Sequence, residues 1–166
     1  MKGKQQRDRD KSKRLCLTAY RRYYVRREFA SAKALVLRAL KADNGYYYAH
    51  FLMGLLLKSD DPSGAVACLR KCVELEPHYP RAWDELGWLF ARDKDRLAES
   101  IDMFKRAHEL DPSFVWTTLA LANRTYAAGD IESSRGYYLE ALALEPQNEA
   151  CVESYQEFRR WLREKD

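Results

Sequence analysis

The chain has 166 residues, of which 46% are hydrophobic and 33% are charged, a composition typical of a water-soluble globular protein with a charged surface. No run of about 18 apolar residues occurs, so we expect no transmembrane helix. No apolar stretch follows the basic N-terminus, so we expect no secretory signal and a cytoplasmic protein with reduced thiols. Its four cysteines are Cys16, Cys68, Cys72 and Cys151.

The net charge of +4 is an average over two unlike parts of the chain. Residues 1–27 contain eleven Lys and Arg against two Asp, a net charge of +9, whereas the remainder contains 18 basic and 23 acidic residues, a net charge of −5. Such an asymmetry often marks contacts with nucleic acid, a membrane surface or an acidic partner. The alternative is a solvated terminus and first helix without a partner.

A short phrase recurs along the chain at nearly constant spacing. Three copies end in proline, at residues 73–77, 108–112 and 142–146, and their prolines are 35 and 34 residues apart. A fainter copy at residues 40–44 lies 33 residues before the first of these prolines, counted from Asn44. Self-similarity at such a period is the signature of a repeat protein, in which each repeat is one supersecondary unit.

Each interval between these phrases predicts a helix, a turn and a second helix. Apolar residues recur at helical spacing from Trp83 to Phe90 and again over residues 97–107. The turns carry capping residues: residues 128–130 offer a glycine for a left-handed helix end and an aspartate cap, and residues 59–63 offer a cap and a helix-starting proline. No segment alternates with a period of two, so we expect an all-α chain without strands.

The phrase Trp83-x2-Leu86-Gly87-x2-Phe90, followed by a second helix and Pro112, resembles the tetratricopeptide repeat. The resemblance implies a right-handed α-solenoid of antiparallel helix pairs, with small residues where paired helices approach closely. The small-residue positions of the second helices are Ala32 and Ala39, Ala65 and Cys72, Ser100 and Ala107, and Ser134 and Ala141. The predicted parts are a basic flexible tail (1–12), four repeats (13–46, 47–79, 80–114 and 115–148) and a C-terminal capping helix (149–166).

In proteins that resemble this chain, the first helices line a concave groove that binds a peptide or helix of a partner protein. The resemblance therefore implies a non-enzymatic interaction module, adaptor or assembly scaffold. The groove-facing positions are Arg14, Leu17, Arg21 and Tyr24; Tyr48, Phe51, Leu55 and Lys58; Arg81, Asp84, Trp88 and Ala91; and Trp116, Leu119, Asn123 and Tyr126. Core packing is an equally good interpretation of Phe51, Leu55 and Leu119. The strongest candidates for exposed contacts are Trp88, Trp116 and Tyr126, because other residues already fill the packing positions of their helices.

One form of this family grips the C-terminal carboxylate of an Hsp70 or Hsp90 tail with Lys, Arg and two Asn from three successive first helices. The two Asn positions hold Arg21 and Leu52 in one frame, and Leu55 and Glu85 in the next. We therefore expect that such tail peptides do not bind.

The basic N-terminal arm suggests an alternative function. Its candidate residues are Lys11, Lys13, Arg22, Arg26 and Arg27, and Tyr20, Tyr23 and Tyr24 alternate with arginines on the same predicted helix. Cations neutralise phosphates and tyrosines stack on bases, so the chain could be a nucleic-acid-binding or ribonucleoprotein component. An acidic protein partner fits the same charges, Tyr20 and Tyr23 also fit packing positions, and self-association through exposed repeat faces stays open.

The sequence contains no catalytic, cofactor-binding or metal-binding motif. It has no glycine-rich phosphate loop, no His-Glu-x-x-His and no Gly-x-Ser-x-Gly. Cys68 and Cys72 lie one helical turn apart without a second pair at zinc-ligand spacing, and His50, His78 and His108 lie in unrelated settings. We therefore expect no enzymatic activity, no metal and no cofactor.

Overall fold

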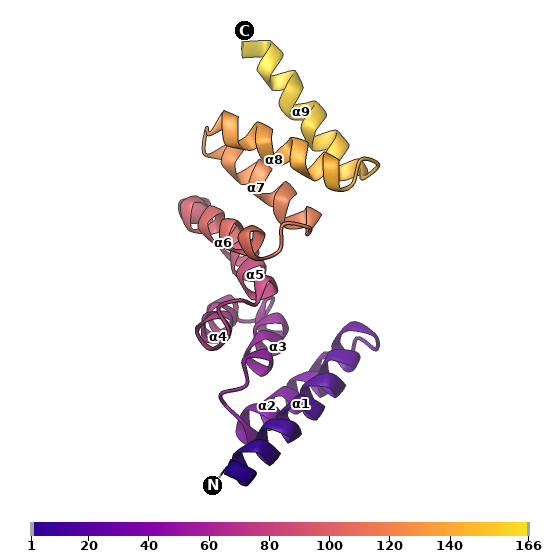
Figure 1. The fold of residues 1–166 in the computed structure, drawn as a ribbon, viewed down its shortest axis with the longest axis vertical. Coiled ribbons are helices and arrows are strands. Elements are labelled where there is room, and N and C mark those ends of the chain that lie inside the picture. Colours follow the sequence, from indigo (N-terminus) through magenta and orange to yellow (C-terminus); the bar gives the residue numbers. More distant parts are fainter. Residues whose placement is uncertain (1, 166) are drawn as a thin grey trace. The chain divides into compact units, whose positions relative to one another are not determined.

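The computed structural model describes residues 2–165, and this part of the chain contains only helices and their connections (Figure 1). The α-helices are α1 (Lys2–Tyr24), α2 (Phe29–Ala42), α3 (Tyr47–Leu57), α4 (Pro62–Leu75), α5 (Pro80–Phe90), α6 (Leu97–Leu110), α7 (Val115–Ala127), α8 (Ile131–Leu144) and α9 (Glu149–Lys165). A 3₁₀ turn, η1 (Lys94–Arg96), precedes α6. The all-α class predicted from the repeat pattern is confirmed.

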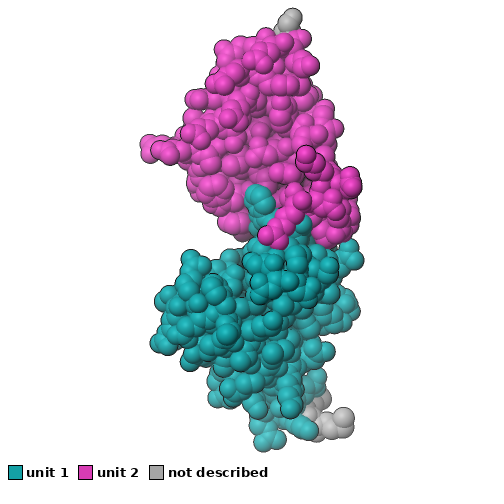
Figure 2. Space-filling model, turned by 180° about the vertical axis from the view of Figure 1, so that it is seen from behind, with its two compact units in different colours: residues 1–89 teal, residues 90–166 magenta. Residues whose placement is uncertain are grey.

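The chain divides into two compact units, one ending at Leu89 and the other starting at Phe90 (Figure 2). The first unit contains the hairpins α1–α2 and α3–α4 and most of α5, and α3 also contacts α1 and α2. The second unit contains η1, α6, the hairpin α7–α8 and α9, and α7 also contacts α6.

Small side chains allow the paired helices of the first hairpin to approach each other closely. On α2, Ala32, Val36 and Ala39 are fully buried, and on α1 the residues Cys16 and Ala19 are almost fully buried. Helices without bulky side chains at their contact pack with their axes about 8 Å apart. The small-residue positions recognised in the sequence thus lie in the core of this hairpin.

Gly54 on α3 marks an especially close contact with α4. A Cβ atom at this position would lie 2.7 Å from Leu69 Cγ and 2.9 Å from Leu69 Cδ2, inside van der Waals contact. Leu69 is itself fully buried, so its side chain has little room to move. The first-helix glycine of this repeat is therefore required by packing.

Residues 2–12, expected to form a flexible tail, are the first three turns of α1. Lys, Gln and Arg are good helix formers, and no proline interrupts this segment. Arg9 Nε donates to Asp43 Oδ2 at 2.5 Å, and Arg9 Nη2 donates to the carbonyl oxygen of Gly45 at 3.3 Å. These bonds connect α1 to the α2–α3 connection, and Ser12 is fully buried one turn later.

The capping residues predicted for two turns are confirmed. Asp61 Oδ1 accepts a hydrogen bond from the Gly64 amide at 2.9 Å, with Pro62 as the first residue of α4. Asp130 Oδ1 accepts from the Ser133 amide at 3.1 Å at the start of α8, and Gly129 has φ of +80°. Each aspartate thus pairs one of the amides that have no partner within the helix at its start, and Gly129 adopts the left-handed backbone that ends the preceding helix.

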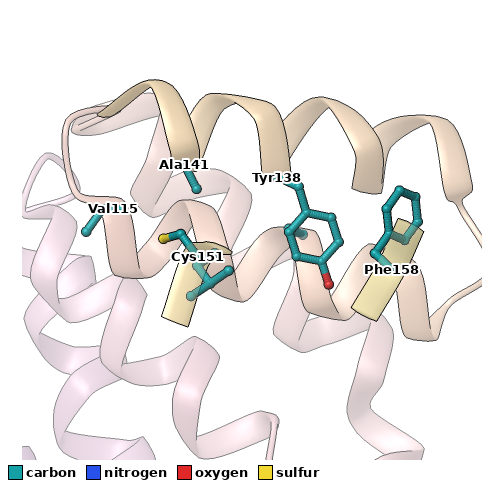
Figure 3. Close-up of a cluster of buried hydrophobic side chains, with 7 residues drawn as sticks. Val115, Tyr138, Ala141, Cys151 and Phe158 are labelled. Atoms are coloured by element: carbon teal, nitrogen blue, oxygen red, sulfur yellow. The ribbon is translucent and has the colours of Figure 1, made fainter. Parts of the chain in front are cut away.

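The helix α9 packs its apolar face against the hairpin α7–α8. Cys151 and Phe158 are buried with Tyr138 and Ala141 of α8 in one hydrophobic cluster, shown in Figure 3. Further members of this cluster are Val115, Leu119 and Ala122 of α7. This contact covers the apolar side of the last hairpin, which is the role expected of an end helix.

Candidate functional site

Three successive first helices of the repeats bring predicted groove residues together in the first unit. Arg81 of α5 interacts electrostatically with Tyr20 and Tyr24 of α1 and with Tyr48 of α3. Arg81 is exposed, and the three tyrosines are partly exposed. We call these four residues the tyrosine–arginine face.

Aromatic contacts hold the side chains of this face in place. The Tyr20 and Tyr24 rings have their centroids 4.6 Å apart, and the Tyr48 ring stacks on Phe51 at 5.7 Å. Phe51 in turn meets Tyr79 edge-on at 5.0 Å. Because Phe51 is fully buried, it forms a rigid support beneath Tyr48 and has no surface for a ligand.

Tyr24, Tyr48 and Arg81 keep their protons around neutral pH. Burial raises the pKa of Tyr48 to about 12 and also raises the pKa of Tyr24, although the nearby Arg81 opposes both shifts. Burial lowers the pKa of Arg81, but the neighbouring tyrosines raise it above its usual value overall. The face therefore presents neutral phenols and one guanidinium cation, which are hydrogen-bond donors for carbonyl and carboxylate oxygens.

An ion pair between Lys58 of α3 and Glu85 of α5 lies in the same unit. Glu85 also acts electrostatically on Tyr24, which places its carboxylate at the edge of the tyrosine–arginine face. The predicted groove cation Lys58 is thus partly neutralised. Neither Glu85 nor Tyr20 is among the groove positions predicted from the sequence: Glu85 occupies a clamp position without an asparagine, and Tyr20 fits a packing position or a stacking role on the basic arm.

Burial contradicts several predicted groove positions. Phe51, Leu55 and Leu119 have 0%, 5% and 6% of their surfaces exposed, so the core-packing alternative holds for all three. Asp84 is also buried, at 7%. Helical spacing alone does not separate a groove position from a core position when both faces of a helix are apolar.

In the second unit, α7 presents one of its four predicted groove residues openly. Trp116 is 47% exposed. Asn123 Oδ1 accepts a hydrogen bond from the Tyr138 hydroxyl at 2.6 Å, and the Tyr126 ring packs edge-on against Phe158 at 5.6 Å. Because α9 packs over Tyr126, this tyrosine is a packing residue and not an exposed contact residue.

In the first unit, the predicted contact residue Trp88 of α5 is 40% exposed.

The basic arm contains residues with different roles. Arg22 Nη1 donates to Glu28 Oε2 and to Ser31 Oγ, both at 2.7 Å, so this arginine joins α1 to the start of α2. Arg26 lies 4.0 Å from Glu28, and Arg27 occupies the turn with φ of 58°. The remaining predicted cations Lys11, Lys13, Arg14 and Arg21 are exposed.

Residues 2–165 also bear on metal binding and on membrane insertion. No group of three or more His, Cys, Asp or Glu in this range is arranged to hold a metal ion. No helix in the same range is long and apolar enough to cross a membrane. His50 is buried, and its Nε2 lies 2.8 Å from the carbonyl oxygen of Asn44.

Comparison with known proteins places this architecture in a class. No protein-family model matches the chain. The chain is 30% identical over 97 residues to the peroxisomal targeting signal receptor of Saccharomyces cerevisiae, a match that covers 58% of this chain and 16% of the receptor's length. The chain thus spans a small part of that relative.

Solved structures share the fold at low sequence identity. Pseudomonas aeruginosa PilF matches with a TM-score of 0.79 and 18% identity, over 96% of this chain and 71% of that one. YrrB, described as a TPR protein with an unusual peptide-binding site, matches with a TM-score of 0.68 and 21% identity, over 81% and 69% of the two chains. The chain has the tetratricopeptide-repeat fold, an α-solenoid of helix hairpins, and the resemblance recognised in its sequence is confirmed.

Proposed function

We propose that the chain is a non-enzymatic protein-interaction module, an adaptor or assembly scaffold, and that it binds a peptide or helix of a partner protein along the tyrosine–arginine face. The observation that carries this proposal is the convergence of Tyr24, Tyr48 and Arg81 from three separate repeats. A ligand that touches all three would span α1, α3 and α5, as expected for an extended peptide or a helix.

The chemistry of the face supports a protein ligand. Partly exposed tyrosines and an arginine are the residue types that dominate binding energies at protein interfaces. Their hydroxyl and guanidinium donors match backbone carbonyls and acidic side chains of a peptide. The peptide-binding site named for YrrB lies on the same fold, which makes peptide binding the natural first hypothesis for this chain.

The experiment is a peptide-display selection on the purified chain, followed by titration of the selected peptides. We expect Arg81→Ala and Tyr48→Ala each to weaken binding by about tenfold, the loss typical of an interface hot spot. The matched control is Arg38→Ala, which removes an exposed arginine on α2. Selected peptides that bind equally well to the Arg81 variant, or that lose the same affinity with the control, would contradict the proposal.

A further inference from the structure

An exposed side of α1 and the residue that follows it carry a second surface, which includes the predicted groove positions Arg14 and Arg21 and whose residues recur every three or four positions. These are Lys4, Arg7, Lys11, Arg14, Thr18, Arg21 and Val25, and all seven are exposed. We call them the α1 stripe. Alternating steps of three and four keep side chains on one face of a helix, which is the spacing that a second helix can follow.

The cations of the stripe lack acidic partners. No carboxylate of residues 2–165 forms an ion pair with Lys4, Lys11, Arg14 or Arg21 in the structure, and Arg7 Nε donates to the carbonyl oxygen of Gly3. From Lys4 to Arg21 the stripe extends about 26 Å along the helix. Five positive charges along this length, including Arg7, form a row complementary to a row of carboxylates.

The charge pattern in the N-terminal half of α1 opposes the helix that its good helix formers favour. Residues 2–14 contain no apolar side chain, and the first turn contains lysines and no acid. Positive charges near a helix N-terminus oppose the helix dipole, and like charges three or four residues apart repel each other. An anionic partner removes both penalties, so binding and helix stability in this segment are coupled.

Two observations favour a protein over a nucleic acid as the occupant. Leu17, which lies beside the stripe, is 56% exposed, and Val25, which belongs to it, is 75% exposed. Both offer apolar contact to an amphipathic helix. The tyrosines of α1 are turned to other rings: Tyr23 meets Phe29 edge-on with centroids 5.4 Å apart. Bases therefore find no free stacking platform on the stripe.

We propose that the α1 stripe docks an acidic amphipathic helix of a partner protein, with its carboxylates along Lys4 to Arg21 and its apolar residues over Leu17 and Val25. This surface is additional to the tyrosine–arginine face. Its tests use residues outside that face, so that failure of one proposal leaves the other standing.

The probe is a synthetic amphipathic peptide of about three heptads with Leu and Glu in register, long enough to cover the stripe. Binding is measured by fluorescence anisotropy. We expect a charge-reversed variant, K4E/R7E/K11E, to lose about tenfold or more in affinity, and Val25→Asp to weaken binding separately. The matched control, K33E/R38E/K41E, reverses three exposed cations on α2 and leaves the affinity unchanged.

Amide hydrogen exchange supplies a second readout. We expect the peptide to slow exchange over residues 2–10 of wild type and not of K4E/R7E/K11E. The proposal is overturned if a scrambled peptide of the same composition binds with equal affinity, or if the α2 control variant loses as much affinity as the stripe variant. It is also overturned if a single-stranded RNA oligonucleotide binds more tightly than the peptide and the stripe variant abolishes that binding. Absence of peptide binding, or self-association of the chain that the stripe variant abolishes in sedimentation experiments, overturns it as well.

Discussion

The guanidinium carbon of Arg81 on α5 lies 5.8 Å from the centre of the Phe51 ring on α3. A cation above an aromatic ring is attracted by the negative face of the ring. Since Phe51 is fully buried, its ring keeps its place beside Arg81. At an exposed site such an attraction contributes about 0.5–1 kcal/mol, so it favours this position of the charged group before a ligand binds and reduces the ordering cost of binding.

The close contact at Gly54 predicts opposite effects for two Gly→Ala substitutions. Gly54→Ala is expected to destabilise the chain by about 1–3 kcal/mol, because its Cβ would overlap the buried Leu69. Gly136→Ala on α8 has no heavy atom within 4 Å of the new Cβ and is expected to stabilise by about 1 kcal/mol or less. Urea unfolding followed by circular dichroism measures both. A stabilising Gly54→Ala would show that the α3–α4 contact is looser than described.

The docking of α9 predicts a local effect of Phe158. Phe158→Ala is expected to lower the free energy of unfolding by about 3–5 kcal/mol, because it leaves a cavity in the cluster shared with Tyr138. Hydrogen exchange should accelerate first in α9, since Phe158 is the larger of the two buried side chains of this helix. Glu157→Ala changes an exposed neighbour and should have little effect. Unchanged exchange in α9 of the Phe158 variant would contradict this arrangement.

The buried thiols predict a loss of stability at alkaline pH. Burial raises the pKa of Cys16 and Cys72 from 9.0 to about 12, despite opposing hydrogen bonds. Between these values the unfolded chain loses protons that the folded chain keeps, so stability falls as the pH rises above about 9, by up to about 1.4 kcal/mol per pH unit for each thiol. Burial of the tyrosines acts in the same direction at higher pH.

Urea unfolding at about pH 7.5 and pH 10 tests this dependence. Cys72→Ala removes one titrating group and places a small side chain at a buried small-residue position, so it should reduce the slope. A free energy of unfolding that is constant between these two pH values would show that the thiols are open to solvent.

The structure also bears on peptides that end in the Hsp70 or Hsp90 tail sequence. At the clamp positions, Leu52 is 2% exposed and Glu85 is paired with Lys58. Neither can donate hydrogen bonds to a terminal carboxylate as asparagine does. We expect no binding of such a peptide in calorimetric titrations up to millimolar concentration. Micromolar binding would mean that another set of residues performs this recognition.

The helix pairs could be predicted from the sequence, because a period of about 34 residues and small-residue positions such as Ala32 and Ala65 reflect direct packing constraints. The site was harder to predict. Tyr126 has the same sequence signal as Trp88, but α9 covers it, and only tertiary contacts with Phe158 reveal this. The helical state of residues 2–12 was also missed, because Arg9 reaches Asp43, a contact between distant parts of the sequence. The repeat boundaries themselves stay an interpretation.

Photo-crosslinking tests the central claim most directly. A photoreactive phenylalanine analogue is placed either at Tyr24, on the tyrosine–arginine face, or at Leu37, which is 55% exposed on α2. With a peptide selected on the wild-type chain, we predict crosslinking from position 24, its loss on adding Arg81→Ala, and none from position 37. Crosslinking from position 37, or crosslinking from position 24 that persists without Arg81, would contradict peptide recognition by this face.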